Sequence, residues 1–270
     1  VSHEIAPTVL PATQNNPDLR QIIVIGGETP PGTTSYADFI DGADPYDTCH
    51  ASADETAFWL YSSGSTGQPK GVRHVHGALQ ATAETYGAQV LQIREDDTIF
   101  SAAKIFFAYG LGNAFTFPMS VGATTILFNG RPTPDGVLDI IDAEKPTIFC
   151  GVPTLYAAMN AALANRPKSP APLRRCISAG EALPEETGNQ WSAHWGVDIL
   201  DGVGSTEMLH IFLSNAPGDV VYGTSGTAVP GYDLRCVTED GIQITPGEIG
   251  ELLVRGASAA DGYWNKRQKS

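Results

Sequence analysis

The chain has 270 residues, 42% of them hydrophobic and 17% charged, and its formal net charge is −14. This composition is typical of a soluble globular protein and argues against intrinsic disorder. A nucleic-acid-binding protein normally carries a basic face, so the acidic balance disfavours that class of partner.

The first predicted element is a buried strand at 21–25, which ends at a pair of glycines. Residues 28–54 are rich in Pro, Gly, Asp and Thr and predict a long surface connection. An apolar run at 56–61 predicts a strand that leads into a polar loop. Strands and helices alternate after that point. The predicted strands are 97–101, 123–128, 147–151, 174–178 and 197–200, and the predicted helices are 77–91, 109–120, 134–143, 153–164 and one that opens at Pro184.

This alternation predicts an α/β fold with a mostly parallel sheet covered by helices. Ligands of such sheets bind beyond the carboxyl ends of the strands, and we expect the loop after 56–61 and a turn at 201–207 to lie there. After about residue 220, glycines separate short strands at 233–237 and 249–255 and predict a small β-rich antiparallel subdomain. We therefore expect an α/β subdomain over 1–219 and a β-rich subdomain over 220–270.

The polar loop is the most informative block, with the sequence Tyr-Ser-Ser-Gly-Ser-Thr-Gly-Gln-Pro-Lys-Gly at 61–71. Glycines that allow close backbone approach, hydroxyl donors and one lysine together favour a polyphosphate site. The spacing is not that of a Walker loop, because Gln68 and Pro69 separate the last glycine from Lys70. An ordinary polar surface loop is the alternative. The predicted phosphate-binding residues are Ser62, Ser63, Gly64, Ser65, Thr66, Gly67 and Lys70.

A second block, Asp-Gly-Val-Gly-Ser-Thr-Glu at 201–207, places a carboxylate beside a hydroxyl on a glycine-rich turn. Such a turn can hold Mg²⁺, which uses few protein carboxylates and completes its shell with phosphate oxygens and water. The alternative is a strand-to-helix turn in which Ser205 or Thr206 caps the helix.

Two further blocks lie between these motifs. Residues 178–184, Ser-Ala-Gly-Glu-Ala-Leu-Pro, occupy a predicted strand-to-helix turn, which could also be an ordinary βα connection. Residues 104–113 bring aromatic side chains together before two glycines. Such a cluster is either core packing or the wall of an apolar pocket.

Together these blocks resemble the acyl-adenylate-forming superfamily. The segments at 106–113, 151–156, 178–184 and 204–212 are similar to those of bacterial benzoate–CoA ligases, and the resemblance extends over essentially the whole chain. It implies the large domain of an ATP-dependent acid–thiol ligase, whose substrates are benzoate or a related aryl carboxylate, ATP and CoA, with Mg²⁺ as cofactor.

The resemblance also implies residue roles. Lys70, Thr206 and Glu207 would act on the phosphates, with Glu207 holding the metal. Phe107 stands where many relatives have histidine, which suits an aromatic acid, and Val203 replaces an aromatic residue that stacks on adenine in relatives. The implied adenine-region residues are Gly180, Glu181, Ala182, Asp201, Gly202 and Val203. The implied benzoate-pocket residues are Ala108, Tyr109, Ala179, Gly204, His210 and Ile211, although a lone histidine such as His210 is more often a satisfied structural residue.

Residues 250–256 and 262–265 match a late motif of the family. The family next has a Gly-Asp pair that binds ribose and a small domain with a catalytic lysine, and neither follows here. We therefore expect an internal fragment that makes no benzoyl-CoA by itself. Alternatives are a non-catalytic nucleotide-binding or structural piece, a domain that feeds a carrier protein, and a parent enzyme specific for a hydroxy- or otherwise substituted benzoate.

The four cysteines, Cys49, Cys150, Cys176 and Cys236, are widely spaced and form no CxxC pair. This spacing fits neither a disulfide framework nor a zinc site, and it favours buried, inert thiols in a reducing cytoplasm. No apolar run is long enough for a transmembrane helix and no secretory signal is evident, so we expect no membrane partner.

Overall fold

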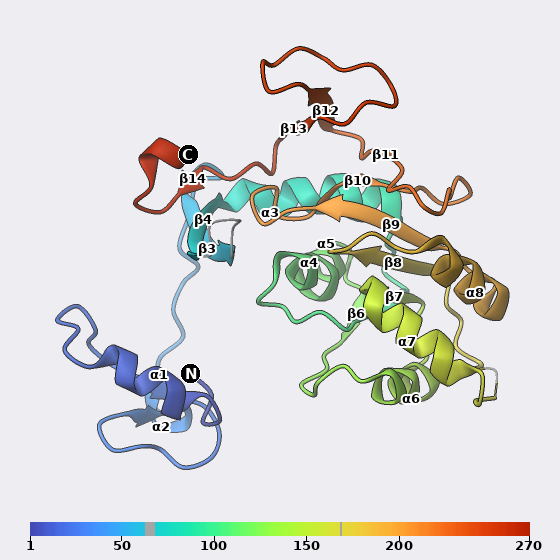
Figure 1. The fold of residues 1–270 in the computed structure, drawn as a ribbon. Helices are drawn as coiled ribbons and strands as arrows, with labels where there is room; N and C mark the ends of the chain where they lie inside the picture. The colour runs from blue at the N-terminus through green and yellow to red at the C-terminus, as the bar shows by residue number, and fades with distance from the viewer. Residues whose placement is uncertain (63–67, 168) are drawn as a thin grey trace. The chain divides into compact units, whose positions relative to one another are not determined.

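The computed structural model describes residues 1–62, 68–167 and 169–270. These residues form two compact units, Val1–His50 and Ala51–Ser270, of which the first is the blue part of the ribbon in Figure 1. The second unit contains every residue predicted to take part in chemistry.

The first unit has little regular structure. Its strands β1 (Ile23–Val24) and β2 (Thr34–Ser35) pair in parallel, and its helices are α1 (Ala6–Thr13) and α2 (Tyr36–Ile40). The predicted strand at 21–25 is thus present but short. The prediction that 28–54 is only a surface connection was wrong, because β2 and α2 lie within it. The Ser35 hydroxyl accepts a hydrogen bond from the Asp38 N–H and begins α2, which composition alone did not indicate.

A seven-stranded sheet forms the centre of the second unit, with strand order β11-β10-β9-β8-β7-β5-β6. The strands from β9 to β6 run parallel, whereas β10 and β11 are antiparallel to their neighbours. This arrangement confirms the predicted α/β fold with a mostly parallel sheet. The strands are β5 (Thr98–Ser101), β6 (Thr124–Ile126), β7 (Ile148–Gly151), β8 (Arg175–Ala179), β9 (Ile199–Gly204), β10 (Ile211–Ser214) and β11 (Thr227–Ala228).

Helices cover both faces of this sheet because its central strands are apolar on both sides. Phe149, Cys176 and Ile199 pack against α6, α7 and α8, which lie together on one side of the sheet in Figure 1. Ile148 and Ile177, from the alternate positions, pack toward the helical segments of 76–91 and 108–121. The helical segments are α3 (His76–Thr82), η1 (Ala83–Leu91), α4 (Ala108–Leu111), η2 (Gly112–Thr116), α5 (Phe117–Val121), α6 (Pro134–Glu144), α7 (Pro153–Leu163) and α8 (Glu185–Trp195).

Three strands form a second, antiparallel sheet in the order β14-β4-β3. They are β3 (Thr56–Ser62), β4 (Lys70–Val75) and β14 (Gly262–Tyr263), and Figure 1 shows them side by side near the C-terminus. The strand predicted at 56–61 is therefore present, but it is not part of the parallel sheet. The loop after it connects two antiparallel strands, and because residues 63–67 lie outside the described residues, its expected place at the carboxyl edge of the parallel sheet stays a prediction.

The strands predicted after residue 220 are also present. β12 (Tyr232–Val237) and β13 (Glu251–Gly256) form an antiparallel pair, and the short helix η3 spans Arg267–Lys269. In the same region β11 pairs with β10 of the large sheet, and β14 pairs with β4. The final segment of the chain thus contributes strands to both of the earlier sheets.

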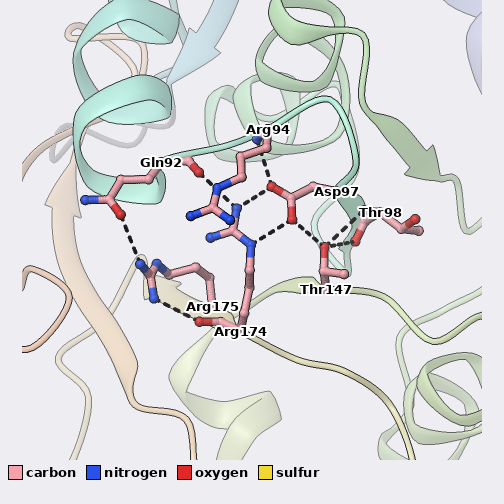
Figure 2. Close-up of polar contacts among 7 residues, drawn as sticks. All are labelled: Gln92, Arg94, Asp97, Thr98, Thr147, Arg174 and Arg175. Carbon is pink, nitrogen blue, oxygen red and sulfur yellow. Dashed lines mark hydrogen bonds and ion pairs between the residues drawn. The ribbon is translucent and has the colours of Figure 1, made fainter.

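A buried ion pair braces the large sheet at the amino ends of its strands (Figure 2). The Asp97 carboxylate is almost fully buried and binds the Arg174 guanidinium, the Thr147 hydroxyl at 2.7 Å and the Arg94 N–H at 2.8 Å. Burial alone would raise the pKa of Asp97, but these hydrogen bonds outweigh it and hold the pKa below its usual value. The brace joins the start of β5 to the segments that lead into β7 and β8.

Two other sequence predictions can be compared with the fold. No helix among the described residues is long and apolar enough to cross a membrane. All four cysteines are free, but only Cys150 and Cys176 are buried, so the prediction of four buried thiols was wrong for the exposed Cys49 and Cys236.

Candidate active site

The candidate site centres on the turn that joins β9 to β10. β10 returns antiparallel to β9, with Ile211 opposite Gly204. A Cβ atom at Gly204 would lie 2.7 Å from the His210 carbonyl oxygen, so only glycine permits this close return. Ser205 accepts a hydrogen bond from the Met208 N–H at 3.1 Å, but the chain then enters a strand. The alternative of a strand-to-helix turn capped by Ser205 or Thr206 was therefore wrong.

A cavity of about 220 Å³ opens beside this turn. All six residues predicted to form the benzoate pocket line it, although they come from helix α4, strands β8, β9 and β10, and the turn. This volume is below the ~300–1,000 Å³ of pockets that hold drug-sized ligands, so it suits a small acid. The lining residues are Phe107, Ala108, Tyr109, Ala179, Gly180, Gly204, Ser205, Thr206, His210 and Ile211.

His210 is enclosed by aromatic rings rather than by polar partners. Its ring centroid lies 4.9 Å from that of Tyr86, 5.8 Å from that of Tyr109 and 4.7 Å from that of Phe117. Neither ring nitrogen has a hydrogen-bond partner among the described residues. Burial lowers the pKa of His210 to about 3, although the backbone of Tyr109 acts in the other direction, so the imidazole is neutral at physiological pH. The position of His210 in the lining of the small cavity, beside Tyr109, favours the pocket assignment.

Tyr109 forms a fixed wall of the cavity. Its hydroxyl donates to the carbonyl oxygens of Gly151 at 3.0 Å and Ile177 at 3.2 Å, which anchors the ring to β7 and β8. Burial raises the pKa of the Tyr109 hydroxyl well above its usual value, so it remains a donor. Phe106 and Phe107 are more than half exposed, which argues against core packing for that part of the aromatic block.

Glu207 is linked to Lys70 through a tyrosine that the sequence did not single out. The Tyr263 hydroxyl donates to Glu207 Oε1 at 2.8 Å and accepts from Lys70 Nζ at 3.5 Å. The Lys70 ammonium also lies 4.5 Å from the centre of the Tyr263 ring. Burial and the adjacent Glu207 carboxylate raise the pKa of Tyr263 to about 12, so the hydroxyl is protonated.

The backbone of Thr206 is in contact with a second residue to which the sequence analysis gave no role. His74 is fully buried in β4, its ring stacks on Phe58, and its Nε2 lies 2.8 Å from the Thr206 carbonyl oxygen. Burial lowers the pKa of His74, although the Thr206 carbonyl and the Glu207 charge act in the other direction. The only signal in the sequence was the alternation of β4, which places His74 and Val72 on the same buried face.

The predicted phosphate loop is the hairpin connection between β3 and β4. Ser62, at the end of β3, lies opposite Lys70, at the start of β4. Lys70 is half-buried and directed toward Tyr263, whereas Ser63, Gly64, Ser65, Thr66 and Gly67 lie outside the described residues. The structure therefore places the two ends of the loop beside the Glu207 turn.

The predicted adenine region is divided between a surface turn and a strand. Gly180, with a φ of +98°, and the exposed Glu181 and Ala182 follow β8. The prediction that 201–203 belong to a turn was wrong, because β9 extends to Gly204. Asp201 and Gly202 are buried in that strand, and burial raises the pKa of Asp201 despite hydrogen bonds that oppose it. Val203 is 37% exposed and presents only a small apolar surface.

The side chains at the turn fit a magnesium ion carried by nucleotide phosphates. Among the described residues, no cluster of three or more His, Cys, Asp or Glu side chains could hold a metal on its own. Glu207 Oε2 accepts no hydrogen bond from a described residue, and the Thr206 hydroxyl lies beside it in the chain. Mg²⁺ commonly binds one or two carboxylates together with phosphate oxygens and water, which is the donor set that this turn could complete.

A larger apolar cavity of about 670 Å³ adjoins the small one. The two share Phe107, Tyr109, Ala179 and Gly180, and the larger cavity extends toward the start of α7. The sequence block at 151–156 supplies Val152, Thr154 and Leu155 to this extension, whereas Pro132 and Pro134 come from a segment with no chemical motif.

Comparison with known proteins agrees with this geometry. Residues 1–264 match the family model described as AMP-binding enzyme. The chain is 52% identical to a benzoate–CoA ligase of Thauera aromatica, over 100% of this chain and 51% of that protein. A crystal structure of a benzoate CoA ligase from Burkholderia xenovorans LB400 superimposes with a TM-score of 0.91 at 46% identity, over 100% of this chain and 53% of the other.

The anthranilate CoA ligase AuaEII, solved in complex with anthranoyl-AMP, superimposes with a TM-score of 0.94 at 40% identity, over 100% of this chain and 52% of the other. The chain thus spans about half the length of the relatives that it matches. The resemblance to benzoate–CoA ligases, predicted from four sequence blocks, is confirmed. The chain belongs to the family of AMP-binding enzymes.

Proposed function

We propose that the protein binds ATP with Mg²⁺ and an aryl carboxylate of the size of benzoate, and activates the acid as an aryl adenylate. The observation that carries the proposal is that one turn, residues 204–211, contributes both the wall of the small aromatic cavity and Glu207. A carboxylic acid held in the cavity would lie next to the residues that we assign to the phosphates.

The proposed first step is an attack by a carboxylate oxygen of the acid on the α-phosphorus of ATP. A new P–O bond forms, the bond to pyrophosphate breaks, and negative charge increases on the leaving phosphates. Lys70 would hold these phosphates together with the 62–67 loop, and the Thr206 hydroxyl would contact the α-phosphate. Mg²⁺ at Glu207 would neutralise phosphate charge. The protein's contribution is then positioning and electrostatic stabilisation.

The cavity supports an aromatic rather than an extended substrate. Tyr109, His210 and Ile211 present flat or branched surfaces to it, and the neutral imidazole adds no charge to the apolar end. The carboxylate would face the Ser205–Glu207 side, where the polar groups are. A hydroxy- or amino-substituted benzoate would differ from benzoate by one or two contacts with the pocket, worth about 1–3 kcal/mol each. The proposal therefore names the class of small aryl carboxylates, with benzoate as its simplest member.

For the whole protein, CoA is the proposed acceptor of the acyl group. Its thiol sulfur would attack the acyl carbonyl of the adenylate, forming the thioester and releasing AMP. The support is the chain's similarity to benzoate and anthranilate CoA ligases. A cytoplasmic site for this reaction is consistent with the four free cysteines, because disulfides are rare in that compartment.

Isothermal titration of the purified protein tests the proposal. We expect saturable heat with Mg-ATP, and we expect tight binding of a non-hydrolysable benzoyl-AMP analogue, because it occupies both halves of the site. Benzoate-dependent exchange of pyrophosphate into ATP tests the first step separately. Cyclohexylacetate, a bulkier non-aromatic acid, is the control substrate. Absence of heat with both nucleotide ligands would support a purely structural role instead.

A further inference from the structure

We propose that Tyr263 is a positioning residue, which fixes the Glu207 carboxylate for the nucleotide-bound metal and aligns it with Lys70. The inference rests on the proposed function, because it concerns the same metal and phosphates. It adds a residue from a distant part of the chain, for which the sequence motifs predicted no role.

The contacts that this role requires are present in the structure. Tyr263 donates to Glu207 Oε1 at 2.8 Å, and Lys70 Nζ is 3.5 Å from the same hydroxyl. One hydroxyl therefore bonds both the predicted metal ligand and the predicted phosphate-binding lysine. Tyr263 orders Oε1, and Oε2, which accepts no hydrogen bond from a described residue, is the oxygen that we assign to the cation.

The backbone around Tyr263 fixes its position from two sides. Gly262 and Tyr263 pair with Arg73 and Val72 of β4, and the Trp264 N–H donates to the Gly71 carbonyl oxygen at 2.8 Å. The Ala260 N–H donates to the backbone oxygen of Glu207 itself, also at 2.8 Å. The segment thus connects the hairpin that carries Lys70 to the turn that carries Glu207.

Two further contacts strengthen this connection. Arg73 of β4 forms an ion pair with Asp261 at 2.8 Å. On the other side, the Ser258 hydroxyl donates to the Met208 carbonyl oxygen at 2.7 Å and is bonded to the Tyr232 hydroxyl. Tyr263 is therefore presented on a backbone that is held on both flanks, which a residue needs if it is to orient another side chain.

The hydrogen bond from Tyr263 reduces the entropy that the Glu207 side chain loses when it binds a metal. A glutamate side chain has three rotatable bonds, and ordering it on binding a metal costs entropy. A hydrogen bond to one oxygen orders the side chain beforehand. Loss of such an outer partner typically weakens metal affinity by 10–100-fold. Because Glu207 is only half-buried, we expect the low end of that range for Tyr263.

The test compares Tyr263→Phe with Tyr222→Phe. Both substitutions remove one hydroxyl that is bonded to a carboxylate, since Tyr222 donates to Asp198 at 3.0 Å, but Tyr222 is not among the residues of the candidate site. Phenylalanine at 263 keeps the ring beside Lys70. The measurement is a Mg²⁺ titration of the purified protein in the presence of α,β-methylene ATP, followed by isothermal calorimetry, with thermal unfolding as a check on folding.

We expect Tyr263→Phe to weaken the apparent Mg²⁺ affinity about tenfold, with benzoate affinity unchanged and a thermal midpoint close to that of Tyr222→Phe. We expect Tyr222→Phe to bind Mg²⁺ like the wild type. Unchanged or tighter Mg²⁺ binding by Tyr263→Phe would overturn the inference, because tighter binding would mean that Tyr263 competes with the metal.

A third variant separates this inference from the proposed function. Glu207→Gln removes the carboxylate that we assign to the metal, and we expect it to weaken Mg²⁺ binding more than Tyr263→Phe does. If Glu207→Gln has no effect, the proposed metal site is wrong and the positioning role falls with it. If Glu207→Gln weakens binding and Tyr263→Phe does not, only the inference about Tyr263 is wrong.

Discussion

Gly112 leaves the space that the His210 imidazole occupies. A Cβ atom at Gly112 would lie 2.5 Å from Cδ2 and 2.8 Å from Nε2 of His210, and 2.9 Å from the Phe117 ring. Real Cβ atoms do not approach other atoms so closely, so any larger residue must displace a ring. The glycine on helical segment η2 therefore sets the position of a cavity wall on the distant 204–211 turn.

Gly112→Ala should push His210 toward the cavity and weaken the binding of aryl carboxylates roughly tenfold, since overpacking of this kind costs about 1–3 kcal/mol. Gly77→Ala is the matched control, because its Cβ would come no closer than 3.3 Å to any atom. Calorimetric titration with benzoate checks the effect. Equal affinity of the two variants would show that His210 does not form a rigid wall.

The buried His210 should make the folded state sensitive to acid. Its pKa is about 3 in the folded protein and about 6.5 when unfolded, so below pH 6.5 the unfolded state binds the proton first. Stability is then lost as the pH falls from 6.5 toward 3, at about 1.4 kcal/mol per pH unit. Between about pH 7.5 and about pH 5 the expected loss from this group is about 2 kcal/mol.

The measurement is urea unfolding of wild type and His210→Gln at both pH values. Each protein is compared with itself, so any packing defect of glutamine cancels from the pH difference. We expect the wild type to lose about 2 kcal/mol more than the variant on acidification. His74, whose pKa is also lowered, is present in both and contributes equally. A pH difference that is the same in both proteins contradicts the assignment.

The alternation of strands and helices was predictable because the large sheet is buried on both faces. Strand-like runs of three to six residues with helices between them indicate parallel strands without any knowledge of the partners. The sheet membership of β3 was not predictable in this way. Its run contains Trp59 and Tyr61, which are 48% and 70% exposed. Local composition does not distinguish a strand of the helix-covered sheet from a strand with an exposed face.

The residues of the candidate site were predictable where they lie in a sequence block that resembles the family. All six residues predicted for the pocket line one cavity, because the family resemblance relates sequence blocks that the fold brings together. Tyr263 and His74 were missed for a different reason. Tyr263 bonds Lys70 across 193 positions and Glu207 across 56, so its role depends on the pairing of β14 with β4, which the motif at 262–265 did not indicate.

The Asp97–Arg174 ion pair should contribute strongly to stability. Asp97→Asn would leave the Arg174 guanidinium without its anion at the amino ends of the strands (Figure 2). Breaking a buried pair on one side costs about 3–5 kcal/mol, and we expect about 3 kcal/mol because Arg174 keeps some contact with water. Asp233→Asn removes the anion from the exposed Arg255 pair and should cost about 1 kcal/mol or less.

Urea unfolding at neutral pH compares the two variants directly. The lowered pKa of Asp97 adds a second signature, because stability from this carboxylate is present above its unfolded pKa and is lost as the pH falls through the folded value. Asp97→Asn should therefore flatten the acid limb of the stability curve. A similar loss of stability for both aspartate variants would mean that the pair is not effectively buried.

Tyr109 and Tyr156 share one acceptor, which allows stability and ligand binding to be separated. Both hydroxyls donate to the Ile177 carbonyl oxygen, at 3.2 and 2.9 Å, but only the Tyr109 ring lines the small cavity. Each phenylalanine substitution should lower the free energy of unfolding by about 1 kcal/mol. Only Tyr109→Phe should weaken benzoate binding, by a few-fold, because its ring loses the anchor to β7 and β8. Equal effects of the two substitutions on benzoate affinity would indicate that the cavity responds to the sheet as a whole and not to the orientation of Tyr109.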